Sequence, residues 1–298
     1  MLNIEKYGAI DIGSNAIRLL IITIIEQEGR DTKFKKTSLI RVPIRLGADV
    51  FTKGKVSDAN YKRMIDSLNA FQLLMKAHNV VKYRACATSA MREAKNGKEI
   101  TENLLRETGI SIDIIDGNDE AKIIASTDLR TYLVHDKTFL YVDVGGGSTE
   151  LTIFSEGKRV VSKSFKNGTV RLINNLVDDS MWIEMKNWIK THTENYSHIT
   201  LLGTGGNINS TYKFSGTKIG KPLSFSYLKE YFKKVNSLSY EDRISILDMN
   251  PDRADVIIPA LKIYISAMKW SGAEEVYVPK IGLSDGIIRS LYNEKVRN

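Results

Sequence analysis

The sequence predicts an α/β protein built from two duplicated lobes. A short pattern occurs twice, in which apolar residues lead into an aspartate, a glycine and a serine, and a second apolar run follows. The copies span residues 8–15 and 141–149, and their aspartates, Asp11 and Asp143, lie a little under half the chain apart. Segments with strand periodicity also alternate with segments at helical spacing, as they do in α/β domains. We therefore expect two facing lobes, each with one strand–turn–strand unit.

The first half contains the elements of one such lobe. Residues 8–25 predict strand, turn and strand, and residues 39–46 alternate as a strand does. Ser57 is the expected N-cap of a helix, because apolar residues follow it at helical spacing. Further strands are expected at 80–88 and 110–115, and further helices at 100–108 and from 118 to about Leu133.

The second half repeats this order. Strands are expected at 138–144, 149–154, 159–165, 199–202 and 276–278, and helices after Gly168, at 255–270 and at 282–293. The strand at 199–202 leads into a third glycine-rich turn at residues 203–206. The last helix is expected to pack back on the first lobe.

The two repeated turns have the chemistry of phosphate sites. Glycine lets backbone N–H groups approach a ligand closely, and successive N–H groups form a concave anion site. The hydroxyls of Ser14, Ser148 and Thr149 add donors. An aspartate beside a phosphate requires a cation between them, so Asp11 and Asp143 indicate Mg²⁺ or a similar hard ion. The alternative is a pair of glycine-rich hairpin turns with turn-favouring aspartates.

Composition limits the classes of function. The 298 residues suffice for two domains, and 42% hydrophobic with 26% charged residues is typical of a soluble globular protein. The single cysteine, Cys86, excludes an internal disulfide and a multi-cysteine metal site. No signal peptide or membrane span is visible in the sequence, so the cytoplasm is the expected location. The net charge of +8 suits an acidic partner, but no nucleic-acid-binding module is recognisable.

Eight short motifs, in order, resemble those of the exopolyphosphatase/guanosine pentaphosphate phosphohydrolase family. They lie at residues 9–15, 45–47, 87–92, 117–121, 143–150, 203–206, 250–255 and 282–286, and so cover nearly the whole chain. The resemblance implies ribonuclease-H-like lobes of the actin-like ATPase fold with an interlobe cleft. It also implies lobe boundaries of 1–122 plus 283–298 and of 123–282. The chain resembles the short members, which lack a C-terminal helical extension.

The resemblance assigns roles to individual residues. Glu120 matches the catalytic glutamate, Asp143 the catalytic aspartate, and Glu150 an acidic residue of the metal site. Asp143 and Glu150, together with Asp11, form the expected Mg²⁺ site. The expected phosphate-binding residues are Gly13, Ser14, Asn15, Arg45, Arg92, Gly145, Gly146, Gly147, Ser148, Thr149 and Gly205. Asn207, after the third turn, departs from the family, in which a basic residue is usual there.

Each assignment has a plainer alternative. Glu120 is also what helix dipoles favour at a helix start, and Glu150 could be an exposed strand carboxylate. Arg45 and Arg92 could be surface residues, and Lys163, Lys166 and Arg171 are placed along the substrate path by charge alone.

The expected activity is hydrolysis of the terminal phosphate of inorganic polyphosphate, of guanosine pentaphosphate, or of both. A small-molecule kinase of the same fold, with an adenosine pocket at residues 203–206, is one alternative. A non-catalytic polyphosphate or alarmone sensor is another, although the four acidic residues argue against lost catalysis. No nucleic-acid or membrane partner is expected, and a homodimer is left open.

Overall fold

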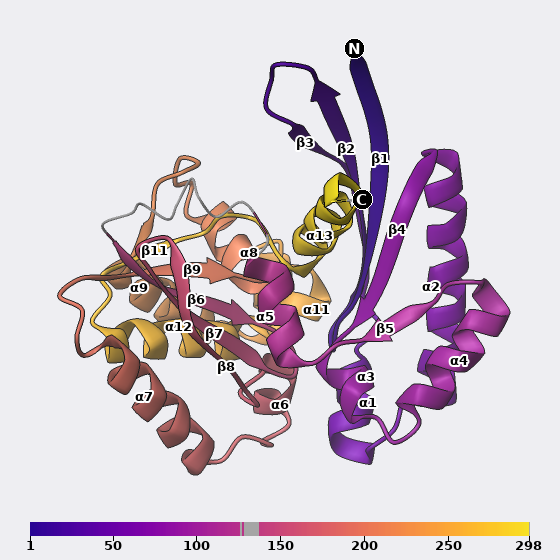
Figure 1. Ribbon diagram of the computed structural model, residues 1–298. Coiled ribbons are helices and arrows are strands. Elements are labelled where there is room, and N and C mark those ends of the chain that lie inside the picture. The colour runs from indigo at the N-terminus through magenta and orange to yellow at the C-terminus, as the bar shows by residue number, and fades with distance from the viewer. Residues whose placement is uncertain (126, 128–136, 298) are drawn as a thin grey trace. The chain divides into compact units, whose positions relative to one another are not determined.

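A computed structural model describes residues 1–125, 127 and 137–297. The chain divides into two compact units: unit 1 is Met1–Thr127 with Gly282–Asn298, and unit 2 is Asp128–Ile281. Each unit has its own sheet (Figure 1). None of the described helices is long and apolar enough to cross a bilayer.

The sheet of unit 1 has the strand order β3-β2-β1-β4-β5. The central strand β1 is antiparallel to β2 and parallel to β4; β2 is antiparallel to β3, and β4 is parallel to β5. The strands are β1 (Leu2–Ile12), β2 (Ile17–Gln27), β3 (Lys33–Val42), β4 (Val80–Ala87) and β5 (Ile112–Ile114). The helices are α1 (Leu46–Lys53), α2 (Asp58–Ala77), α3 (Ser89–Glu93), α4 (Gly97–Thr108), α5 (Gly117–Ala125) and α13 (Leu283–Arg297).

Successive side chains at the end of β1 lie on opposite faces of this sheet. Ile10 and Ile12 belong to the apolar cluster that includes Leu68 and Phe71 of α2. Because successive strand side chains point to opposite faces, Asp11 lies on the other face. Helices α13 and α5 lie on that face, in contact with each other, whereas α2 and α4 cover the first (Figure 1).

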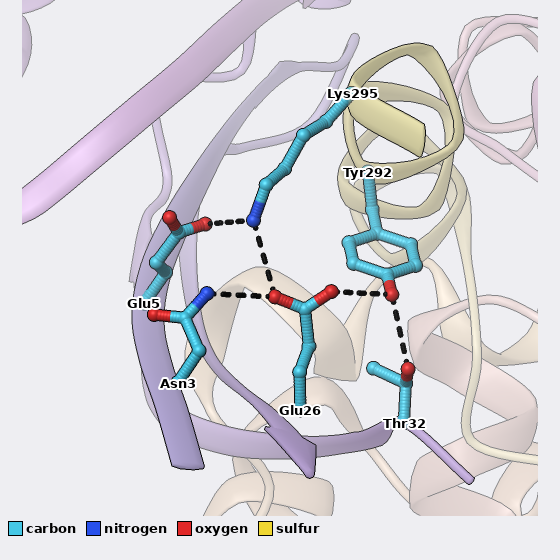
Figure 2. Close-up of polar contacts among 6 residues, drawn as sticks. All are labelled: Asn3, Glu5, Glu26, Thr32, Tyr292 and Lys295. Carbon is cyan, nitrogen blue, oxygen red and sulfur yellow. Dashed lines mark hydrogen bonds and ion pairs between the residues drawn. The ribbon is translucent and has the colours of Figure 1, made fainter. Parts of the chain in front are cut away.

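Polar contacts hold the C-terminal part of α13 against β1 and β2 (Figure 2). Lys295 Nζ lies 2.9 Å from Glu5 Oε2 and 3.1 Å from Glu26 Oε2. The hydroxyl of Tyr292 donates to Glu26 Oε1 at 2.8 Å. The hydrogen bonds from Tyr292, Lys295 and Asn3 lower the pKa of Glu26. The last helix is thus an integral part of unit 1.

The sheet of unit 2 repeats that of unit 1. From its β8 edge the order is β8-β7-β6-β9-β11-β10, so β6 takes the place of β1 and β10 is an added edge strand. The strands are β6 (Thr138–Val144), β7 (Thr149–Ser155), β8 (Lys158–Phe165), β9 (Ile199–Thr204), β10 (Leu223–Ser224) and β11 (Glu275–Tyr277). The directions also match, because β6 is antiparallel to β7 and parallel to β9. The predicted α/β class with two duplicated lobes is confirmed.

Helices complete unit 2. Alternate residues of β6 (Leu140, Val142 and Val144) pack into a core that includes Met185 and Tyr264. Asp143 therefore lies on the opposite face of the sheet, as Asp11 does in unit 1. The helices are α6 (Thr169–Ile173), α7 (Asp179–Thr193), α8 (Gly206–Phe214), α9 (Phe225–Asn236), α10 (Tyr240–Ser245), α11 (Pro251–Ala254) and α12 (Ile257–Ser271).

Several local expectations are corrected. The strand expected at 39–46 begins earlier and ends at Val42, and Leu46 is the first residue of α1. Arg45 has a left-handed backbone (φ 62°) that no strand continues through. Helices α7 and α9 were not predicted. The end expected for the helix that starts near residue 118 falls outside the described residues, since α5 is described only to Ala125.

Candidate functional site

Both repeated turns are tight connections between paired antiparallel strands. We call residues 13–16 the first loop and residues 145–148 the second loop. In the first, Gly13 N donates to Ala16 O at 3.1 Å, and in the second, Gly145 N donates to Ser148 O at 2.9 Å. The same bond at the same position shows that the two loops are equivalent.

The residue seven positions after each aspartate lies directly opposite it. Asp11 is in register with Arg18 across β1 and β2, and Asp143 with Glu150 across β6 and β7. Directly opposed residues share one face of the sheet, with their Cβ atoms about 5 Å apart. The two hairpins thus differ in charge at equivalent positions.

In unit 1 the counter-charge of Asp11 is provided by the chain itself. Asp11 is 4% exposed, and its Oδ2 lies 2.7 Å from Nη1 of Arg18. Arg18 was not predicted as a site residue. Its spacing from Asp11, equal to that between Asp143 and Glu150, was the signal that could have identified it.

The first loop is held by residues that follow β3. Arg45 N donates to Asn15 O at 3.0 Å, and Gly47 N donates to Ser14 O at 2.7 Å. The hydroxyls of Ser14 and Ser89 form a buried hydrogen bond of 2.9 Å. Unit 1 therefore brings the predicted residues Gly13, Ser14, Asn15 and Arg45 together at one end of its sheet.

Glu120 lies in the first turn of α5 and is 9% exposed, which excludes the surface alternative. Burial raises the pKa of the neighbouring Cys86 thiol to about 12, and the charges of Asp113, Asp11 and Glu120 add to that effect while Arg84 opposes it. Cys86 of β4 is in register with Asp11 of β1. Glu120 and Asp11 thus act electrostatically on the same group in unit 1.

Arg92 supports the segment that leads into α5. Its Nη1 donates to Ile115 O at 2.7 Å. Ile115 N is bonded to Ala87 O at the end of β4, and Glu120 N to Asp116 O. At least one guanidinium nitrogen of Arg92 is therefore used to hold the backbone just before Glu120.

In unit 2, Glu150 is held by two hydroxyls. It is 3% exposed, and its Oε1 accepts hydrogen bonds from Ser148 Oγ at 2.6 Å and from Ser164 Oγ at 3.0 Å. This burial excludes the alternative of an exposed strand carboxylate. The hydroxyl of Thr149, which is fully buried, donates to Asn167 O at 2.6 Å.

The third glycine turn, residues 203–206, lies directly beside Asp143. Gly205 has φ 111°, and a Cβ there would stand 2.9 Å from Val144 O and 3.3 Å from Asp143 Oδ1. Tyr264 donates to Thr204 O, and Thr204 Oγ1 donates to Tyr141 OH at 2.7 Å. Burial raises the pKa of both tyrosines, and the charge of Asp143 raises it further.

The donor set near the second loop fits a hard cation. Asp143 and Glu150 are opposed carboxylates on one sheet face. Mg²⁺ is usually bound through one or two carboxylates, with substrate phosphates and waters completing the shell. Within the described ranges, no three His, Cys, Asp or Glu residues form a ready-made metal cluster. The arrangement thus suits a cation that arrives with a phosphate ligand.

The second loop also presents free donors. The backbone N–H groups of Gly146, Gly147 and Ser148 have no hydrogen-bond acceptor in the described part of the chain. Three successive N–H groups next to two carboxylates form an arrangement that can bind a phosphate together with its cation. Unit 2 thus brings the predicted residues Asp143, Gly145, Gly146, Gly147, Ser148, Glu150 and Gly205 together.

Comparison with known proteins extends this picture. "Exopolyphosphatase 1" of Mycobacterium tuberculosis is 21% identical, over 95% of this chain and 87% of that protein. A "Guanosine-5'-triphosphate,3'-diphosphate pyrophosphatase" of Aeromonas hydrophila is 26% identical over 98% of this chain, but the match spans 60% of that protein. A crystal structure of an exopolyphosphatase from Cytophaga hutchinsonii superposes with a TM-score of 0.84 over 97% of this chain and 98% of that one, at 22% identity, and shows the same fold.

A sequence profile of the Ppx/GppA phosphatase family matches residues 24–295. That range contains Glu120, the second loop with its opposed carboxylates, and the third glycine turn. Since it covers most of the sequence, this chain belongs to the Ppx/GppA phosphatase family.

Proposed function

We propose that this protein hydrolyses the terminal phosphoanhydride bond of inorganic polyphosphate, of guanosine pentaphosphate, or of both. The observation that carries the proposal is the second loop, with three N–H donors that have no acceptor among the described residues and lie beside Asp143 and Glu150. The relatives named exopolyphosphatase and guanosine pentaphosphate pyrophosphatase support the two substrate classes.

In this proposal, the N–H groups of Gly146, Gly147 and Ser148 bind the oxygens of the terminal phosphate. Glu120 accepts a proton from the water that attacks the terminal phosphorus. The new P–O bond forms as the anhydride P–O bond breaks, so that orthophosphate and a substrate shortened by one phosphate leave. Phosphoryl transfer depends mainly on such positioning and charge neutralisation.

Asp143 and Glu150 are the residues proposed to hold Mg²⁺. When bound, the ion would neutralise charge on the phosphate oxygens. Ser148 and Ser164 donate to Oε1 of Glu150 and so fix the orientation of this carboxylate. Gly205 leaves the space that Asp143 needs.

The test is phosphate release with Mg²⁺ from long-chain polyphosphate and from guanosine pentaphosphate, measured in parallel. We expect release by the wild type and a loss of about 10²- to 10⁴-fold in Glu120→Gln, because that change removes a general base while keeping the size of the side chain. The faster substrate identifies the preferred class.

The matched control is Glu102→Gln, an exposed glutamate of α4 in the same unit. It should release phosphate at the wild-type rate. Absence of release by the wild type from either substrate would contradict the proposal. A Glu120→Gln variant as active as Glu102→Gln would remove Glu120 from its proposed role.

A further inference from the structure

Residues 169–171 hold the second loop through its carbonyl oxygens. Three donors bind three successive glycine carbonyls: Thr169 N to Gly145 O at 3.0 Å, Val170 N to Gly146 O at 2.8 Å, and Arg171 Nε to Gly147 O at 2.8 Å. We call these three donors the carbonyl clamp. Two of them come from the backbone, and the third is a side chain.

The carbonyl clamp determines where the loop N–H groups point. In a trans peptide, the C=O of one residue and the N–H of the next point in opposite directions, and the described chain contains no cis peptide bond. Fixing the carbonyls of Gly145, Gly146 and Gly147 therefore turns the N–H groups of residues 146–148 away from the clamp. These are the N–H groups for which residues 1–125, 127 and 137–297 provide no acceptor.

Unit 1 contains the corresponding bonds. Gly47 N binds Ser14 O, the equivalent of Gly146 O, and Arg45 N binds Asn15 O, the equivalent of Gly147 O. In both units the donors follow the third strand of the unit, which is β3 in unit 1 and β8 in unit 2. The bond that the backbone of Arg45 makes in unit 1 is made in unit 2 by the Arg171 side chain.

The surroundings of Arg171 indicate a fixed role in the protein. It is 8% exposed, whereas arginine is rarely buried unless its charge and donors are satisfied. The clamp also lies directly on the loop, because a Cβ at Gly168 would stand 2.3 Å from Gly146 O. The sequence-based placement of Arg171 along the substrate path is thus at odds with its burial.

We propose that Arg171 is a positioning residue that orients the Ser148 N–H toward the bound phosphate by holding the Gly147 carbonyl. This inference rests on the proposed function only for its activity readout. Without Nε, the Gly147–Ser148 peptide is free to rotate, and one of the three anion donors loses its alignment.

The experiment compares wild type, Arg171→Met, Arg171→Lys and Arg171→Ala. Calorimetric affinity for inorganic phosphate and kcat/KM for polyphosphate are both expected to fall by about 10-fold or more in Arg171→Met, the order of effect of losing a preorganised oxyanion donor. Arg171→Lys keeps the charge but places a methylene where Nε lies, so it should lose affinity as well. Guanidinium added at millimolar concentration should restore the phosphate affinity and kcat/KM of Arg171→Ala.

The matched control is Arg243→Met, in the same unit. Arg243 also binds three backbone carbonyls, those of Val235, Leu238 and Ala254, but none in the second loop. It should lower Tm while leaving phosphate affinity and KM unchanged. A role confined to general stability predicts instead that the two arginine variants behave alike.

Two results would overturn the inference. One is phosphate affinity within twofold of wild type in a folded Arg171→Met or Arg171→Lys. The other is an equal loss of phosphate affinity in Arg243→Met. If the wild type releases no phosphate from any substrate, the proposed function fails, while the phosphate-binding comparison still tests the clamp. If Arg171→Met does not fold, the charge-preserving Arg171→Lys decides the outcome.

Discussion

At the scale of single residues, Asp143 lies directly beside the third glycine turn. Gly205 follows β9 directly, and a Cβ there would stand 3.3 Å from Asp143 Oδ1. Buried Tyr141 and Tyr264 lie within range of its charge, which raises the pKa of each beyond the effect of burial. The tyrosines therefore remain protonated at neutral pH.

We expect Gly205→Ala to reduce both stability and activity. The φ of 111° is unfavourable for alanine, at about 1–3 kcal/mol, and the new Cβ also meets Val144 O at 2.9 Å. Urea unfolding and phosphate release are the measurements. Gly216→Ala is the control, because Gly216 also has a positive φ (65°) but nothing within 4 Å of its Cβ position. A Gly205→Ala variant no less active than Gly216→Ala would refute the effect on Asp143.

The residues of the proposed site can be recognised in the sequence, but few of their contacts can. The glycines, serines and aspartates of the two loops are local patterns, and local patterns can be recognised from spacing. Arg18 was missed although its spacing was visible, because only one of the two hairpins carries a glutamate there. The bond between Arg171 and Gly147 joins residues 24 positions apart through a side chain, which no spacing rule predicts.

At the scale of elements, α13 and α5 depend on each other. A Cβ at Gly286 of α13 would stand 2.3 Å from Ile123 O of α5, so only glycine allows the helices to approach this closely. Helix α5 carries Glu120. The position of the proposed general base is therefore set in part by a helix near the C-terminus.

We expect Gly286→Ala to separate the two helices. Overpacking of this kind destabilises by about 1–3 kcal/mol, and displacement of α5 should lower phosphate release more than it lowers phosphate affinity. Thermal unfolding, turnover and calorimetry are the measurements. Gly282→Ala, just before α13, has nothing within 4 Å and should resemble wild type. Equal turnover in the two variants would show that the close approach is irrelevant to Glu120.

Element prediction succeeded where periodicity was strong and failed where it was not. The hairpin strands and the helix after Ser57 have clear apolar spacing, and both were predicted. Helix α7 has three tightly buried positions, Met185, Ile189 and Thr193, among many exposed or partly exposed residues, so its apolar stripe is narrow. The strand expected through Arg45 was wrong because Arg45 has a left-handed backbone, which the alternation of residues 39–46 does not reveal.

At the scale of the whole molecule, one sheet plan occurs twice, but the two units are completed differently. Unit 2 is formed by one continuous stretch of chain, whereas unit 1 needs α13 from the opposite end. Ile287, Ile288 and Leu291 of α13 are buried, and the contacts of Tyr292 and Lys295 anchor it to the first strands (Figure 2).

We expect a chain ending at Ile281 to lose stability in unit 1 only. All three tryptophans, Trp182, Trp188 and Trp270, lie in unit 2, so their fluorescence follows that unit. In urea, the circular dichroism transition should begin at lower concentration, while the fluorescence midpoint should stay at the full-length value. A parallel fall in the fluorescence midpoint would contradict independent completion of the two units.

The docking of α13 also bears on the order of events during synthesis. A ribosome delivers the strands of unit 1 before the residues of α13, and the whole of unit 2 lies between them in the chain. Unit 2 can assemble its sheet and core before α13 is made, whereas the strands of unit 1 that α13 contacts wait for that helix. The unit whose strands are made first is therefore the second to be completed.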